Sequence, residues 1–333
     1  MQIGRAVDAL TGRRYAGYAV CCLRALIGLV VLATMVTDHG RRAELFGPDG
    51  YYPRDLVRAE MEALGGFNLY LLGDGPLVFE LLFHTGMLIA LCVLVGVGGR
   101  AVLVAHWAFT WSLLQTNPML LDGGDNVTFV VLPMLCLTSC FRHLSLARWV
   151  RGPRAARPSA WGAVLVHNLG VLAIALQICI VYVVSGTYKL QGDMWTEGTA
   201  LYYVLSVPEF AYPPITDALL SWDTGLVLGA YAATALLVFF PVLVLNAALR
   251  PWAVASMVGF HLSIALLMGL TGFALAMIAC DLVFVDRELR TLRRRAGSLR
   301  DRCLAALPAS QAAVPAAVAQ PAGPAVVREG ALT

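Results

Sequence analysis

The sequence predicts an all-α protein, a polytopic membrane helical bundle with about eight transmembrane helices. Hydrophobic residues make up 59% of its 333 residues and charged residues only 14%, whereas soluble domains carry about 25% charged residues. The mean hydropathy is +0.73. Apolar runs long enough to cross the roughly 30 Å hydrocarbon core of a bilayer recur along the chain. These observations predict an integral membrane protein and exclude the soluble globular class.

Six apolar runs each have about the length of one membrane-crossing helix, and they cover residues 15–37, 77–98, 101–117, 125–141, 163–188 and 225–249. A seventh run, at 252–285, is too long for one helix, because its residues would rise about 51 Å. The sequence Gly-Leu-Thr-Gly at 269–272 is expected to break this run into a tight hairpin. The prediction is therefore eight helices, of which the last two are short.

The basic residues predict the orientation of the chain. If the N terminus lies inside, 18 of the 24 basic residues fall on the cytoplasmic side, as the positive-inside rule requires. Both termini are then cytoplasmic. Residues 1–14 form the N-terminal segment, 15–288 the transmembrane domain, and 289–333 an Arg-rich and then Ala/Pro-rich tail that we expect to be disordered.

Composition also limits the ligands. A net charge of +3 is too small to indicate nucleic-acid binding and is better explained by membrane topology. Nearly all of the eight cysteines fall inside apolar runs, without a C-x-x-C spacing. We therefore expect buried thiols rather than disulfides or a metal site. The expected surroundings are the lipid bilayer, with no nucleic acid and no metal.

Lys189 is the only lysine in a chain with 23 arginines, and it follows the fifth apolar run. The predicted layout places it on the outer side, together with residues 121–125 and the 269–272 turn. Lysine, unlike arginine, can lose its proton when it is buried. Asp193 and Glu197 follow it closely. Burial would favour a free amine that acts as a general base, whereas the carboxylates would favour a salt-bridged anchor.

Ionisable residues inside membrane spans are rare and usually face a cavity or a partner. Here they are Arg24, Glu80, His84, His106, His167, His261 and Asp281. Glu80 and His84 stand one helical turn apart and can pair, either as a proton relay or, as we expect, as a structural polar cluster with Arg24. His261 lies near the middle of its span, where it either binds a neighbouring helix or contributes to function.

The stretch Leu-Asp-Gly-Gly-Asp-Asn at 121–126 opens the fourth helix on the outer side. Asp125 is suited to cap the free N–H groups of that helix, and the two glycines permit a tight entry turn. A substrate-facing role for Asp125 and Asn126 is the alternative to capping.

Three motifs together resemble one family of membrane proteins. Gly-Gly-Asp-Asn opens a helix at 123–126, Ser-Gly-Thr-Tyr-Lys-Leu at 185–190 leads to Trp195 and Glu197, and Gly-Phe-His-Leu at 259–262 lies in a late helix. The combination resembles the HTTM family, the horizontally transferred transmembrane domain, which includes the vitamin K-dependent γ-carboxylase. The resemblance extends from about residue 15 to 288.

The resemblance implies a multi-pass membrane enzyme in which Lys189 deprotonates a reduced quinone, a vitamin K- or menaquinol-like cofactor, on the outer face. Asp125 stands where the carboxylase has a histidine, and the large lumenal C-terminal region of the carboxylase has no counterpart, so we expect the quinol-handling half alone. Bacterial members include a protein required to mature a secreted peptide toxin. A small secreted or precursor peptide is therefore the expected partner.

The resulting hypothesis is a bacterial plasma-membrane protein that carries out quinol-linked modification or maturation of a peptide on its outer face. The catalytic candidates around an outer cavity are Lys189, Asp125 and His261, and the substrate-binding candidates are Asn126, Asp193, Trp195 and Glu197. The alternative is a non-catalytic membrane partner or immunity-like factor for an exported peptide, with Lys189 in a structural ion pair. A small-molecule permease is disfavoured, because the sequence has no inverted repeat and no matching pair of broken helices.

Overall fold

A computed structural model describes residue 8 and residues 10–152, 160–210 and 212–306. These residues form helices and no strand, which confirms the all-α prediction. The α-helices are α2 (Ala19–Thr37), α3 (Arg42–Phe46), α4 (Arg54–Leu64), α5 (Pro76–Val95), α6 (Gly99–Leu114), α7 (Gly123–Leu137), α8 (Leu146–Arg151), α9 (Trp161–Leu190), α10 (Asp193–Thr196), α11 (Ala200–Leu205), α12 (Pro213–Leu220), α13 (Asp223–Leu245), α14 (Arg250–Met268), α15 (Thr271–Asp281) and α16 (Asp286–Ala306). Short 3-10 segments are η1 (Asp38–Arg41), η2 (Leu69–Leu71), η3 (Pro118–Leu120), η4 (Pro208–Phe210) and η5 (Leu282–Val285).

Each predicted apolar run contains a helix, and the eight helices concerned are α2, α5, α6, α7, α9, α13, α14 and α15. Five stretches of the described residues are long and apolar enough to cross a membrane: Ala19–Phe46, Pro76–Val95, Trp161–Leu190, Asp223–Leu245 and Arg250–Met268. Helices α6, α7 and α15 are shorter, with 16, 15 and 11 residues. The protein is thus a multi-helix membrane bundle, while the count of eight crossings and the cytoplasmic termini stay predictions.

The predicted hairpin in the last apolar run is confirmed. Helix α14 ends at Met268, and Gly269 follows with φ of +70°, a left-handed conformation that glycine adopts without steric cost. Helix α15 starts two residues later.

The predicted C-terminal tail, residues 289–333, begins within helix α16. The chain continues from α15 through η5 directly into α16, so the arginine-rich start of the predicted tail is helical up to residue 306. The Ala/Pro-rich remainder, predicted to be disordered, lies outside the described residues. Residues up to Thr291 form one compact unit, and those from Leu292 form a second.

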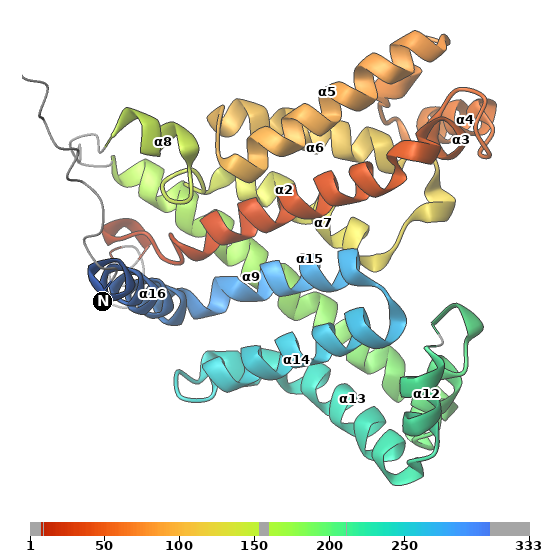
Figure 1. Ribbon diagram of the computed structural model, residues 1–333, viewed down its shortest axis with the longest axis vertical. Coiled ribbons are helices and arrows are strands. Elements are labelled where there is room, and N and C mark those ends of the chain that lie inside the picture. Colours follow the sequence, from red (N-terminus) through yellow and green to blue (C-terminus); the bar gives the residue numbers. More distant parts are fainter. Residues whose placement is uncertain (1–7, 9, 153–159, 211, 307–333) are drawn as a thin grey trace, which may run out of the picture. The chain divides into compact units, whose positions relative to one another are not determined.

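Glycines set the close approach of the packed helices. Helix α9 packs against α7 and then against α13, while α2 packs against α5 and α15 (Figure 1). A Cβ on Gly28 would lie 2.7 Å from the backbone N of Leu94 in α5, and one on Gly186 would lie 2.7 Å from Val238 in α13. Small residues at such contacts let membrane helices approach closely, which is the main source of their association energy.

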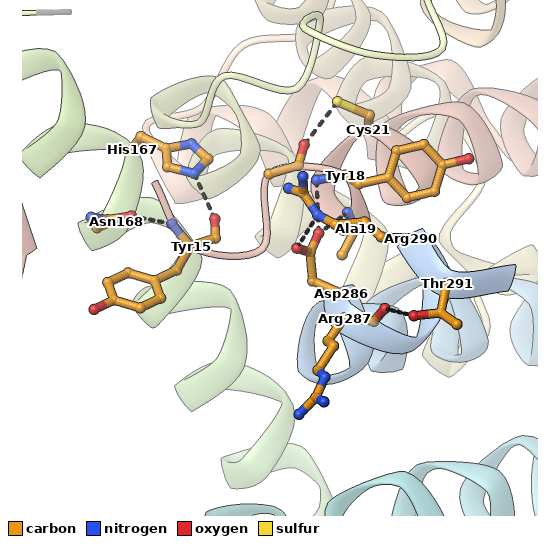
Figure 2. A network of polar contacts seen from close by, with 11 residues as sticks. Tyr15, Tyr18, Ala19, Cys21, His167, Asn168, Asp286, Arg287, Arg290 and Thr291 are labelled. Atoms are coloured by element: carbon orange, nitrogen blue, oxygen red, sulfur yellow. Dashed lines mark hydrogen bonds and ion pairs between the residues drawn. The ribbon is translucent and has the colours of Figure 1, made fainter. Parts of the chain in front are cut away.

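The start of α2 is capped by a side chain from α16 rather than by its own N-cap residue. The N–H groups of Tyr18 and Ala19 donate to Oδ1 of Asp286, at 2.8 and 2.9 Å, and Arg290 Nε donates to Oδ2 at 2.6 Å. Figure 2 shows this network, in which one carboxylate satisfies two backbone donors and is itself paired. Helix α16 therefore fixes the position at which α2 begins.

The segment before α2 is held by α9. His167 accepts the N–H of Ser139 at Nδ1 (2.9 Å), so its Nε2–H donates to the carbonyl of Tyr15 at 2.8 Å. Asn168 accepts the N–H of Tyr15 at 2.9 Å (Figure 2). His167 is thus a structural residue that connects three segments of the chain.

Arg24 does not join the predicted polar cluster. It is fully buried, and it donates to the carbonyls of Val93, Leu94, Cys140 and Leu144. Helices α2 and α5 are antiparallel, so Arg24 at the start of α2 meets the end of α5, and Glu80 lies about 20 Å away along that helix. The prediction of an Arg24–Glu80–His84 cluster is therefore wrong for Arg24.

The rest of that cluster exists and includes Arg42 instead. Glu80 lies 3.4 Å from His84 Nδ1 and 2.9 Å from Arg42 Nε. His84 Nε2 is 3.2 Å from His39 Nε2. The pairing of Glu80 with His84 that their spacing predicted is confirmed. The contacts of this pair with Arg42 and His39 connect α5 to the segment after α2.

Candidate functional site

Lys189 is the second-to-last residue of α9, and α10 begins at Asp193 after a short turn. Its Nζ stands 3.8 Å from the centroid of the Trp195 ring, a geometry in which the negative face of the indole attracts a cation. The turn is fixed from α13, because the Tyr231 hydroxyl donates to the carbonyl of Thr196 at 2.8 Å. The motif therefore holds an amine against an aromatic ring.

The two carboxylates near Lys189 do not pair with it. Asp193 and Glu197 are both exposed, and the ion pairs formed among the described residues do not include Lys189. The salt-bridged anchor that we considered from sequence is therefore not observed. Lys189 is half-buried, and no carboxylate among the described residues forms an ion pair with its amine.

Asp122, rather than Asp125, is the N-cap of α7. Its Oδ1 accepts the N–H groups of Gly124 and Asp125, at 2.7 and 2.9 Å, and Asp125 Oδ2 accepts the N–H of Asp122 at 3.1 Å. This reciprocal pair is a capping box. Asn126 is exposed and donates to the Asp122 carbonyl at 3.2 Å. The capping role predicted for Asp125 is thus shared, with Asp122 as the cap and Asp125 as its partner.

The glycines of this motif bring α7 against α15. A Cβ on Gly124 would lie 2.6 Å from Cα of Phe273, and one on Gly123 would lie 3.2 Å from the Phe273 ring. Neither glycine has a positive φ, so close packing rather than a tight turn explains them. The 121–125 segment therefore lies against α15 at Phe273, the residue that follows the 269–272 turn.

We expect Gly124→Ala to destabilise the protein by about 1–3 kcal/mol, because the added methyl group meets backbone that cannot move aside. The matched control is Gly272→Ala in α15, where a Cβ would meet nothing within 4 Å. Thermal unfolding of both variants in the same detergent measures the difference. Equal stability of the two variants would contradict the packing argument.

His261 lies inside the bundle and not at an outer cavity. Its side chain is 1% exposed, and Nε2 lies 3.1 Å from the hydroxyl of Tyr182 in α9. The same hydroxyl lies 2.8 Å from Oδ1 of Asp281 in α15. The prediction that His261 lines a cavity with Asp125 and Asn126 is therefore corrected, and the Phe273 ring, 5.7 Å from the His261 ring, packs against it.

Sequence reasoning missed Tyr182 and the partner of Asp281. Tyr182 precedes Lys189 by seven residues, a spacing that puts both on nearly the same face of α9, about 10 Å apart. That spacing and the single carboxylate in an apolar run were the available signals. Tyrosine is common in apolar runs, so neither signal identified the contact among α9, α14 and α15.

An apolar cavity of about 240 Å³ lies between α6, α7 and the segment before η2. Its lining residues are Gly66, Phe67, Trp107, Trp111, Phe129, Val130 and Pro133. None of them can donate or accept a proton near neutral pH, so the cavity does not contain the proton-transfer chemistry. No group of three or more His, Cys, Asp or Glu side chains that could hold a metal ion occurs within the described ranges.

Comparison with known proteins assigns the family. The HTTM domain model matches residues 74–288, which is more than half of the chain. This chain belongs to the HTTM domain family. The match contains Lys189, Trp195, Tyr182, His261 and Asp281, whereas α2 lies outside it.

The HTTM chain has two similar proteins in Bacillus subtilis (strain 168). It is 27% identical to the sporulation-delaying protein SdpB over 139 residues, 40% of this chain and 41% of SdpB. It is 26% identical to the uncharacterized protein YitO over 186 residues, 54% of this chain and 55% of YitO. The matches thus span about half of these relatives or less. No solved structure matches this chain significantly.

Proposed function

We propose that this HTTM protein acts in the maturation of a peptide at the outer face of a bacterial plasma membrane, with Lys189 as the base that takes a proton from a reduced quinone. One observation carries the proposal: the Lys189 amine packs on the Trp195 ring at 3.8 Å and has no carboxylate partner among the described residues. A cation–π contact contributes only about 0.5–2 kcal/mol. It positions the amine but opposes loss of its proton only weakly.

The residues around Lys189 suit a planar ring that carries an acidic hydroxyl. When bound, a reduced quinone supplies such a hydroxyl, which reacts with oxygen once it is deprotonated. Trp195 offers an aromatic face next to the amine, and Tyr188 on α9 itself and Tyr202 on α11 expose further aromatic side chains. Lys189 would accept the proton at Nζ, and the turn held by Tyr231 would keep Trp195 in place.

The peptide part of the proposal rests on the relatives and on the exposed carboxylates. The chain is 27% identical over 139 residues to SdpB, whose name describes a sporulation-delaying protein. The carboxylates of Asp193 and Glu197 are exposed and form no ion pair with Lys189 among the described residues. They could bind a cationic or N–H-bearing peptide. These features support, for this chain, a peptide substrate near the amine.

The test is quinol oxidation by the purified full chain in nanodiscs, with menaquinol and oxygen supplied and the products followed by mass spectrometry. Empty nanodiscs and heat-unfolded protein are the controls. Saturable, protein-dependent formation of an oxygenated product supports the proposal. Absence of quinol consumption by folded protein, together with normal peptide maturation in a host that carries Lys189→Arg, would instead favour the non-catalytic partner.

A further inference from the structure

Three helices each bring one polar side chain to the same place inside the bundle. Tyr182 lies about 12 Å from the end of α9, His261 about 10 Å from the end of α14, and Asp281 about 15 Å from the start of α15. In the predicted orientation all three helix ends are on the outer side, which puts the residues near the middle of a hydrocarbon core of about 30 Å. Their exposed fractions are 1%, 1% and 0%.

The tyrosine hydroxyl bridges the other two groups. It lies 2.8 Å from Asp281 Oδ1 and 3.1 Å from His261 Nε2. A hydroxyl has one proton to donate. A carboxylate with a neutral imidazole protonated at Nε2 satisfies both distances, and so do two arrangements that hold one proton more. Either Tyr182 donates to a carboxylate and accepts from an imidazolium, or a carboxylic acid donates to Tyr182, which donates to a neutral imidazole. The two arrangements hold the same number of protons and differ by moving two of them in one direction.

No fixed cation balances the charge of Asp281. The ion pairs within the described ranges do not include it, and the bundle offers no metal-binding group there. On the packed helices, Arg24 of α2 is bound to carbonyls of α5 and of the 140–144 segment. The titratable neighbours are the thiols of Cys179 on α9 and Cys280 on α15 itself, which are ordinarily neutral at pH 7.

The surroundings make an isolated charge costly. Phe240 meets the Tyr182 ring edge to face at 4.8 Å, and Phe260 and Phe273 lie 5.1 and 5.7 Å from the His261 ring. His261 Nδ1 and Asp281 Oδ2 are buried and bonded to no described protein atom. A carboxylate in such a place needs a counter-charge, and a proton is the one that these groups can hold.

We propose that Tyr182, His261 and Asp281 form a proton-binding site in the middle of the bundle, in which the carboxyl and the imidazole share one proton through the tyrosine hydroxyl. The free atoms at the two ends of the chain, His261 Nδ1 and Asp281 Oδ2, are the positions at which a proton enters or leaves. The site does not depend on the role proposed for Lys189, and it makes the contact among α9, α14 and α15 sensitive to protonation.

The test determines where protons reside in the full chain in nanodiscs at neutral pH. Infrared difference spectra report a carboxylic acid C=O band, and ¹⁵N NMR of histidine-labelled protein separates imidazole from imidazolium. Asp281→Asn and His261→Gln assign the signals, Asp281→Glu serves if the asparagine variant does not fold, and Asp217→Asn on the exposed part of α12 is the control. A protonated Asp281 with neutral His261, or a carboxylate with an imidazolium, is the expected result. A carboxylate with neutral imidazole, or both groups protonated, would overturn the proposal.

Tyr182→Phe tests the bridge itself. In the wild-type background, His261→Gln should shift the Asp281 signal, because the two groups communicate through the hydroxyl. In the Tyr182→Phe background the same substitution should leave that signal where it is. An equal shift in both backgrounds would show that the hydroxyl does not couple the two groups, and it would overturn the shared-proton assignment.

Discussion

Lys189→Arg should lower the rate of quinol oxidation by about 10²- to 10⁴-fold, the usual contribution of a general base. Arginine keeps the positive charge and can still stack on Trp195, but it does not lose its proton in proteins. Lys189→Met has neither a charge nor a basic group, and its rate of quinol oxidation should fall by as much as that of Lys189→Arg. The rates are measured with menaquinol in nanodiscs, and unfolding temperatures of the variants verify that both remain folded.

The choice of variants separates the base from a positioning role. Arg41→Met removes a cation whose side chain is 66% exposed and paired with Glu44, and it should leave the rate unchanged. Trp195→Phe keeps an aromatic face and should reduce the rate by less than either Lys189 variant. Retention of the wild-type rate by Lys189→Arg would show that the amine serves as a cation and not as a base.

The positions of the helices could be predicted from the sequence, because apolar run length and glycine at a left-handed turn are local properties. The break after Met268 and the end of α9 near Lys189 follow from such signals. The partner of Arg24 did not follow, because pairing it with Glu80 ignored the antiparallel course of α2 and α5. Two charged residues on neighbouring helices can pair only when they lie at the same depth in the membrane, whatever their residue types.

In the candidate site, too, contacts within one helix could be predicted from the sequence and contacts between helices could not. The spacing of Glu80 and His84 within one helix predicted a real pair, since a helical turn fixes that distance. The capping box was only half predicted, because two aspartates three residues apart share the task at the start of α7. Tyr182 meets Asp281 across helices separated by 99 positions in sequence. The local signals in a single sequence do not identify such a contact.

Arg24→Met should destabilise the protein by about 3 kcal/mol or more, because hydrogen bonds to a charged group contribute about 1.5–3 kcal/mol each and at least two are lost. Arg24 is fully buried and donates to carbonyls at the end of α5 and in the 140–144 segment. The carbonyls of Cys140 and Leu144 would then lose this donor inside the bundle, while the carbonyl of Val93 keeps the N–H of Gly96. The measurement is the free energy of unfolding in mixed micelles, with Arg41→Met as the exposed control.

The lysine variant at this position tests the geometry of the Arg24 contacts. A guanidinium presents five donors in a fixed planar fork, whereas an ammonium is a compact charge with three. Arg24→Lys keeps the charge but cannot reach carbonyls on two sides at once, so its stability should fall between those of Arg24→Met and the wild type. If Arg24→Met unfolds at the wild-type denaturant concentration, these carbonyl bonds do not stabilise the junction of α2 with α5. If Arg24→Lys has the same free energy of unfolding as the wild type, a positive charge alone is sufficient. The several hydrogen bonds of the guanidinium would then not be what stabilises the junction.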